Sequence, residues 1–137
     1  MDMLENEKTP IKVMLVDDEQ GLTTLTKLNL ERDGEFIVAV ENDPLKAVDR
    51  ARVLQPDIIV LDMVMPGMDG GDVAARVRNT PELANVKLII LTALVSQAEA
   101  PDGTVPIAVG GDRCRALAKP VKIELLRQTI LEELNLV

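Results

Sequence analysis

The chain lacks histidine, tryptophan and tyrosine altogether, and it contains a single cysteine, Cys114, and a single phenylalanine. Without histidine, the commonest general base and the commonest metal-binding side chain are both missing, so a hydrolase built on a histidine dyad or triad is excluded. A lone cysteine can form neither an internal disulfide nor a metal site of paired cysteines. We therefore interpret Cys114 as a small, partly buried apolar residue in a protein of a reducing compartment.

Long apolar runs are missing too. No stretch approaches the roughly 20 residues of a membrane-spanning helix, and the polar segment 1–9 has neither the basic region nor the apolar core of a signal peptide. We expect a cytoplasmic protein. The formal charge of −8 disfavours direct binding to nucleic acid or to a membrane, because phosphate groups repel it. A chain of 137 residues has the length of one ordinary domain, so we expect a single domain over 1–137 with its core at about 11–134.

Apolar runs of strand length alternate with segments of helical periodicity. The runs cover residues 11–16, 36–40, 58–61 and 88–91, and a fifth ends at Lys119. The helical segments are marked by Leu22, Leu25 and Leu28, by Ala47, Val48, Ala51 and Leu54 after an N-cap at Asp43 and Pro44, by Val73 and Val77, and by Ile123, Leu126, Ile130 and Leu134. Continuous apolar strands are typical of sheets covered on both faces. The pattern predicts an α/β fold, a doubly wound five-stranded parallel sheet with helices on both faces.

The regularity ends between Thr92 and Lys119. This segment is rich in helix breakers, namely Pro101, Asp102, Gly103, Pro106, Gly110 and Gly111. We expect at most a short helix near 95–100, so the fourth helix of the fold is short or irregular. Alternating Val105, Ile107 and Val109 favour an extended or β segment, although Pro106 argues against a central strand.

Polar residues follow the apolar runs at the points where the strands end. They are Asp17 and Asp18, Asp62, Thr92 and Lys119. In an open parallel α/β sheet, ligands bind outside the carboxyl ends of the strands, so these side chains are expected to share one site. Three carboxylates, a hydroxyl and an ammonium group suit a divalent cation and a phosphoryl group.

Four motifs in the chain resemble those of the receiver domain of two-component response regulators. They are Val16-Asp17-Asp18-Glu19, the run from Leu61 to Gly70, Leu91-Thr92-Ala93, and Ala118-Lys119-Pro120. Each motif alone is weak evidence, but together, in order and each at a strand end, they are specific. The resemblance covers nearly the whole chain and implies a flavodoxin-like fold with strand order 2-1-3-4-5.

The chemistry of each residue agrees with the role that the resemblance implies. Mg²⁺ prefers oxygen ligands, which Asp17, Asp18 and Asp62 would supply, with the backbone carbonyl of Val64 as a further ligand by resemblance. Asp62 is the candidate nucleophile, because a carboxylate can attack phosphorus to give an acyl phosphate. Thr92 and Lys119 would contact the phosphoryl oxygens. Taken singly, each of these residues also has an ordinary role, such as a helix N-cap, a strand end or a solvated charge.

As a receiver, stand-alone or excised, the chain would accept its phosphoryl group from a sensor histidine kinase or a phosphotransfer protein. It would then signal by conformational change and by contact with a downstream protein that the sequence does not identify, and a homodimer is compatible with this role. It would be at most an autocatalytic phosphoacceptor and a slow autophosphatase. We expect slow loss of phosphate, because apolar Val64 and Leu94 flank the approach of water.

Two departures from the family bear on how phosphorylation would change the conformation. Receivers commonly carry Tyr or Phe three residues before the lysine, where this chain has Ala116. Apolar Leu94, Val95 and residues 105–109 lie among helix breakers, so we expect a remodelled, mobile partner surface there. An alternative function is therefore a phosphorylation-independent binding module that uses residues 94–111.

Two enzymatic alternatives fit the sequence less well. A phosphatase of the haloacid dehalogenase type would need a second aspartate two residues after the nucleophile, where Val64 stands. A nucleotide-binding domain would need a glycine-rich loop after the first strand, and none follows it.

Overall fold

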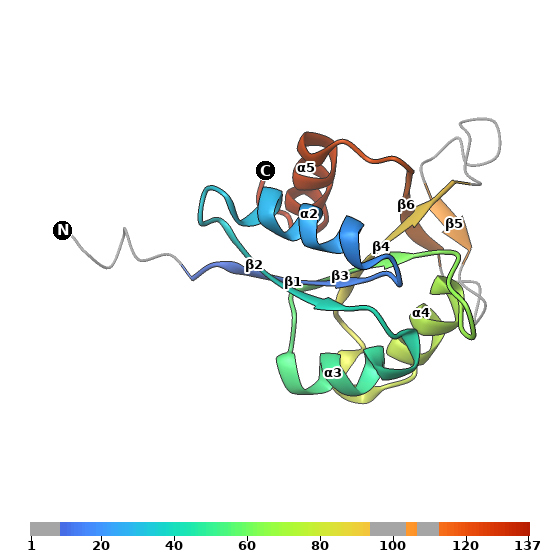
Figure 1. Ribbon diagram of the computed structural model, residues 1–137. Helices are drawn as coiled ribbons and strands as arrows, with labels where there is room; N and C mark the ends of the chain where they lie inside the picture. The colour runs from blue at the N-terminus through green and yellow to red at the C-terminus, as the bar shows by residue number, and fades with distance from the viewer. Residues whose placement is uncertain (1–8, 94–103, 107–112) are drawn as a thin grey trace.

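Five parallel strands form the centre of the molecule in the computed structural model, which describes residues 9–93, 104–106 and 113–137 (Figure 1). The strands are β1 (Ile11–Val16), β2 (Phe36–Glu41), β3 (Ile58–Asp62), β4 (Lys87–Thr92) and β6 (Arg113–Ala118). They are ordered β2-β1-β3-β4-β6, and β5 (Thr104–Pro106) pairs antiparallel with β6 at the edge of the sheet. The predicted five-stranded parallel sheet and its order 2-1-3-4-5 are confirmed. Pro106 lies in the edge strand, where proline is tolerated.

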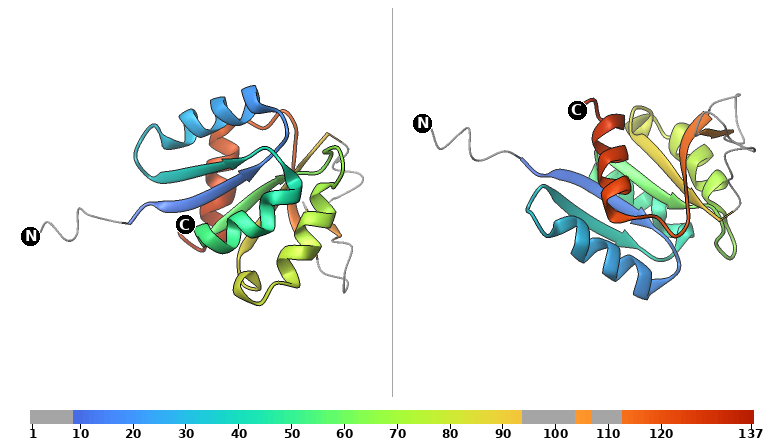
Figure 2. Two further views of the ribbon diagram at one scale, coloured as in Figure 1. Left: turned by 60° about the horizontal axis from the view of Figure 1, so that its bottom comes forward. Right: turned by 90° about the horizontal axis from the view of Figure 1, so that it is seen from above.

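Helices cover both faces of this sheet (Figure 2). The described residues form α2 (Gln20–Glu31) and α5 (Ile123–Glu133) on one face, and α3 (Ala47–Leu54) and α4 (Gly70–Arg78) on the other. Two 3₁₀ turns, η1 (Pro44–Lys46) and η2 (Pro81–Leu83), precede α3 and β4. Asp43 caps η1 by accepting a hydrogen bond from the Leu45 N–H at 3.0 Å. The helix-on-both-faces arrangement predicted from the sequence is therefore confirmed.

The core consists of two hydrophobic clusters separated by the sheet. Alternate residues of β1 belong to different clusters: Val13 and Leu15 pack toward α2 and α5, and Met14 and Val16 pack toward α3 and α4. Both faces of each strand are thereby buried, which explains why the strand sequences are continuously apolar.

Two residues singled out in the sequence lie within β6 and face the cluster of α3 and α4. Cys114 is buried, its Sγ donates a hydrogen bond to the Leu88 carbonyl, and burial raises the pKa of the thiol to about 12. It is therefore a small apolar core residue, as expected. Ala116 is buried beside it, so the position that carries an aromatic residue in many receivers holds a methyl group here.

The helix expected near 95–100 lies outside the described residues, and so does most of the expected partner surface at 94–111. Of that stretch the structure describes only β5. In the described part of the chain, no helix has both the length and the apolar character that a membrane span requires.

Of the leucines that predicted α2, Leu25 and Leu28 lie on its solvent side, and Leu22 borders a cavity beneath the helix. Leu22, Leu25 and Leu28 are 38%, 56% and 63% exposed, whereas Leu30 and Thr23 are buried. The spacing of the leucines identified the helix correctly but not its buried face. That face carries Thr23 and Leu30, and helical spacing alone does not tell which side of a helix packs on the sheet.

Side chains of α2 also cover part of the open edge of β2. Glu31 Oε2 accepts a hydrogen bond from the Val38 N–H at 2.8 Å, and Lys27 Nζ donates to the Val38 carbonyl at 2.7 Å. The two side chains form an ion pair with each other at 2.8 Å. The pair therefore satisfies the backbone groups that an edge strand otherwise offers to a second chain.

This pairing makes a stability prediction with a defined pH range. The hydrogen bond from Lys27 and that from the Val38 N–H lower the pKa of Glu31. Because the folded pKa lies below the unfolded one, ionised Glu31 stabilises the fold above the ordinary value of 4.5, and the contribution is lost as pH falls through the lowered pKa. We expect Glu31→Gln to lower the free energy of unfolding by about 1 kcal/mol at neutral pH, measured by urea denaturation.

The difference in free energy of unfolding between Glu31→Gln and the wild type should become smaller in acid, where Glu31 is protonated. Glu124→Gln, at an exposed glutamate of α5, is the matched control and should change stability little. A difference for Glu31→Gln that stays constant from neutral pH down to strong acid would contradict the assigned role.

Candidate functional site

The acidic residues come together because of the register of the strands. Val16 of β1 is paired with Leu61 of β3, so the residues that follow, Asp17 and Asp62, end adjacent strands. Carboxylate oxygens of Asp17, Asp18 and Asp62 all lie within 4.8 Å of one another. Asp17 and Asp62 are buried, and Asp18 is exposed. The structure thus gathers the three carboxylates in a partly buried corner at the carboxyl edge of the sheet.

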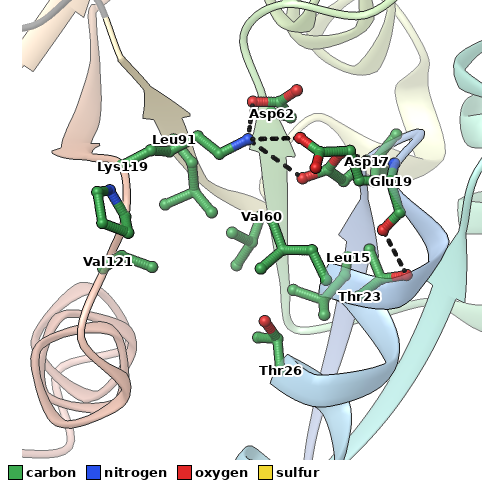
Figure 3. Close-up of a pocket in the computed structure, with 13 residues that line it drawn as sticks. Leu15, Asp17, Glu19, Thr23, Thr26, Val60, Asp62, Leu91, Lys119 and Val121 are labelled. Carbon is green, nitrogen blue, oxygen red and sulfur yellow. Dashed lines mark hydrogen bonds and ion pairs between the residues drawn. The ribbon is translucent and has the colours of Figure 1, made fainter.

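Lys119 joins this corner from the loop directly after β6, a strand two places from β3 in the sheet (Figure 3). Its Nζ donates a hydrogen bond to Asp62 Oδ1 at 2.9 Å. It also lies 3.5 Å from Asp17 Oδ2 and 3.7 Å from Glu19 Oε1. The ammonium group is therefore placed among three carboxylates that belong to two different strand ends. Glu19 was quoted in the first motif but was not assigned a role, and its contact depends on how the loop after β1 folds.

Thr92 and Val64 occupy the positions expected from their strands. Thr92 is the last residue of β4, is 2% exposed, and its carbonyl accepts a hydrogen bond from the Lys119 N–H at 3.1 Å. This backbone hydrogen bond connects the end of β4 with the loop that begins at Lys119. Val64 lies in the loop after β3, with its side chain 63% exposed.

The loop after β3 returns to Asp62 through a close backbone contact. The Gly70 N–H donates to the Met63 carbonyl at 2.9 Å. A Cβ at Gly70 would lie 2.5 Å from the Asp62 carbonyl oxygen, so glycine is required there. Gly67 has φ +85°, a conformation that favours glycine. Both glycines therefore serve loop geometry beside Asp62.

A residue that the sequence analysis missed holds the loop after β1. Asn42 follows β2 at the same edge of the sheet, and its Nδ2 donates to the Asp17 carbonyl at 2.7 Å and to Thr23 Oγ1 at 3.1 Å. These bonds connect the Asp17 backbone with the first turn of α2. The available signal was position alone: Asn42 is a polar residue directly after an apolar strand, as Asp17 and Asp62 are.

The electrostatics of the corner follow from burial and from the crowding of like charges. Burial raises the pKa of Asp17 and the nearby Asp62 charge adds to the rise, while the hydrogen bond from the Glu19 N–H and the charge of Lys119 oppose it. Burial alone would lower the pKa of Lys119. The hydrogen bond to Asp62 and the charges of Asp17, Asp62 and Glu19 outweigh this effect and raise the pKa overall. Lys119 therefore stays protonated.

The donor set fits a hard divalent cation. Mg²⁺ takes oxygen ligands and usually keeps several waters, so a few carboxylates are sufficient to bind it. Asp17, Asp18 and Asp62 offer oxygens close enough together to share one ion. In the described residues, no other group of three or more carboxylate or thiol side chains meets this criterion.

Comparisons with known proteins agree with this geometry. Residues 13–131 match the family model of the response regulator receiver domain. The phosphate regulon transcriptional regulatory protein PhoB of Rhizobium meliloti is 34% identical over 105 residues, which cover 74% of this chain and 43% of that protein. The transcriptional regulatory protein TrcR of Mycobacterium tuberculosis is 40% identical over 72 residues, 53% of this chain and 28% of TrcR. The chain thus spans less than half the length of these two relatives.

Solved structures show the same fold. The Vibrio cholerae chemotaxis protein CheY4 superimposes with a TM-score of 0.76 at 26% identity, covering 91% of this chain and 99% of CheY4. The receiver domain of the Francisella response regulator 1452 gives a TM-score of 0.74 at 28% identity, covering 93% of this chain and 98% of that domain.

The crowding of carboxylates predicts a gain in stability when one charge is removed. The folded pKa of Asp17 lies above its unfolded value, so its ionised form opposes folding at neutral pH and the opposition ends below the ordinary carboxyl pKa. We expect Asp17→Asn to raise the free energy of unfolding in metal-free buffer by on the order of 1 kcal/mol at neutral pH. Chemical denaturation in the presence of a chelator measures this.

Asp18→Asn is the matched control, because Asp18 is the exposed neighbour in the same loop. It should change the stability of the metal-free protein much less. A loss of stability in Asp17→Asn would mean that the Lys119 contact outweighs the cost of burying the charge.

Proposed function

The chain belongs to the response regulator receiver family, and on that premise we propose that it accepts a phosphoryl group on Asp62 in a Mg²⁺-dependent reaction. The observation that carries the proposal is the contact between Lys119 Nζ and Asp62 Oδ1 at 2.9 Å, within a corner of three carboxylates. The contact places the positive charge of Lys119 directly on the carboxylate that would react.

The metal site consists of Asp17, Asp18 and Asp62, to which family resemblance adds the backbone carbonyl of Val64. Bound Mg²⁺ supplies positive charge that offsets the carboxylates and the incoming phosphoryl oxygens. The role of the surrounding residues is to fix the carboxylates that would bind the metal. Asn42 fixes the backbone of Asp17, and the Glu19 N–H fixes Asp17 Oδ1 at 3.0 Å.

The transfer is a displacement at phosphorus. A carboxylate oxygen of Asp62 forms a bond to phosphorus while the bond from phosphorus to the imidazole nitrogen of a donor histidine breaks, and that nitrogen keeps the electron pair. Lys119 Nζ, already hydrogen-bonded to Asp62, neutralises charge on the phosphoryl oxygens, and the Thr92 hydroxyl donates a hydrogen bond to one of them. The donor histidine has to come from a partner, because the chain has none.

The partner is a sensor histidine kinase or a phosphotransfer protein, and the signal passes on by protein contact. A phosphoryl group adds roughly −1.5 to −2 charges at Asp62. This addition changes the charge around the ammonium group of Lys119, which Asp17, Glu19 and Asp62 share in the unphosphorylated protein. PhoB and TrcR are named as transcriptional regulatory proteins and CheY4 as a chemotaxis protein; the proposal leaves open which downstream protein this chain contacts.

Phosphorylation is tested by intact mass after incubation with phosphoramidate or acetyl phosphate and Mg²⁺. We expect one phosphoryl adduct on the wild type and none on Asp62→Asn or in the presence of a chelator, because the reaction needs both the nucleophile and the cation. Asp49→Asn, at an exposed aspartate of α3, is the control and should be modified normally. After removal of the donor, the adduct should decay over many minutes rather than seconds.

An unmodified wild type that still binds Mg²⁺ would refute the phosphoacceptor role. It would favour the alternative, a binding module that acts without phosphorylation. An adduct of equal yield on Asp62→Asn would place the modification on another residue.

The role of Asn42 is tested through Mg²⁺ affinity. Groups that orient metal ligands typically contribute 10- to 100-fold to affinity, so we expect Asn42→Ala to weaken Mg²⁺ binding by about tenfold. Isothermal titration calorimetry is the suitable measurement, since the chain has no tryptophan to report binding. Asn29→Ala on α2 is the matched control. Unchanged affinity in a folded Asn42→Ala variant would show that the loop after β1 holds its shape without this side chain.

A further inference from the structure

A cavity of about 330 Å³ opens beside the carboxylates, on the face of the sheet covered by α2 and α5 (Figure 3). Its rim carries Asp17, Glu19, Asp62 and Lys119, and below the rim it is lined by Leu15, Val16, Leu22, Thr23, Thr26, Val60, Leu91, Pro120 and Val121. Figure 3 shows Val121 on one side of the space and Thr26 and Leu15 on the other, with Val60 between them and the charged side chains above.

The phosphoacceptor chemistry has no use for the lower part of this cavity. Leu15, Val60 and Leu91 come from three neighbouring strands and offer no hydrogen bond to a phosphoryl group. The hydroxyl of Thr23 already donates to backbone carbonyls of its own helix. A space of this size with an apolar lining and a few polar groups at one end has the features of a small-molecule site.

The net charge at the rim indicates the sign of the charge that a ligand should carry. Lys119 is the one cation among the lining residues, and it faces Asp17, Glu19 and Asp62 at 3.5, 3.7 and 2.9 Å. Three carboxylates against one ammonium leave two negative charges in excess. In the metal-free protein an anionic head group would be repelled, and a neutral one would leave the excess uncompensated, so a cation is favoured.

We propose that this cavity binds an organic ammonium ion, a primary amine on an aliphatic or aromatic group of roughly ten non-hydrogen atoms. The size follows from the volume, since a cavity of about 150 Å³ holds benzene and this one holds a ring with a short arm. The apolar group lies between Thr26 and Val121, and the ammonium group lies at the rim beside Asp17 and Glu19.

The ammonium ion and Mg²⁺ require the same carboxylate, that of Asp17. Each therefore weakens the binding of the other, and the effect is reciprocal. The site does not depend on phosphoryl transfer: amine binding and the Asp62 adduct are measured separately, so the failure of one leaves the other standing.

The probe is 2-phenylethylamine, with 2-phenylethanol as its neutral counterpart of nearly equal shape. Binding to the 137-residue chain is followed by two-dimensional ¹H–¹⁵N NMR. We expect saturable shifts of the Leu22, Thr26 and Val121 amides at millimolar amine, binding of the alcohol at least about tenfold weaker, and weaker amine binding when Mg²⁺ is added. Equal affinity for amine and alcohol, or no shift at these amides, would overturn the proposal.

A matched pair of variants on α2 locates the site. Thr26→Phe fills the cavity and should abolish amine binding, whereas Thr24→Phe makes the same change at an exposed position and should leave it intact. Thr26→Leu gives a smaller filling if the phenylalanine prevents folding, which the dispersion of the NMR spectrum reports. Amine binding in a folded Thr26→Phe variant at the affinity of Thr24→Phe would show that the amine binds elsewhere.

Discussion

The site depends on one electrostatic constraint: buried like charges must be compensated. Asp17 and Asp62 are each almost fully buried, and among the described residues it is Lys119 that contacts both. A carboxylate in a partly buried position costs free energy unless an opposite charge or hydrogen bonds offset the loss of water. Lys119 supplies that charge in the metal-free protein. Any cation or phosphoryl group that enters the corner has to change this contact, so binding and conformation are coupled at a single ammonium group.

The fold produces this crowding as a consequence of strand register. Because β1, β3, β4 and β6 run parallel, their carboxyl ends lie at one edge, and residues distant in sequence become neighbours. Two hydrophobic clusters bury both faces of the strands, so the strand ends cannot shift to relieve the repulsion. The Gly70 backbone packs against the Asp62 carbonyl at a distance that no side chain allows. The stability of the core therefore offsets the cost of the acidic corner.

Much of this architecture could be predicted from the sequence, because strand length, helical periodicity and the polar residues at strand ends are local signals. These signals predicted the five parallel strands correctly, and the resemblance to receiver domains gave their order. The parts that were missed all depend on which side chains meet in space. Periodicity located α2 but not its buried face, since Leu25 and Leu28 are as well spaced as core residues and yet are exposed. The hydrogen bonds of Asn42 and Glu31 cross between elements, so no local pattern marks them.

The cavity beside the site shows how an apolar surface can strengthen a charged one. Leu15, Val60 and Leu91 place apolar side chains beneath the rim, and the attraction between two charges grows as the surrounding polarity falls. The same lining therefore makes the ion pair of Lys119 and Asp62 stronger and makes the excess negative charge more costly. A cation that brings its own apolar group would compensate the negative charge of the rim and would also fill the apolar cavity. Mg²⁺ would compensate only the charge. The apolar lining is therefore the feature that would distinguish an organic ammonium ion from Mg²⁺ at this edge of the sheet.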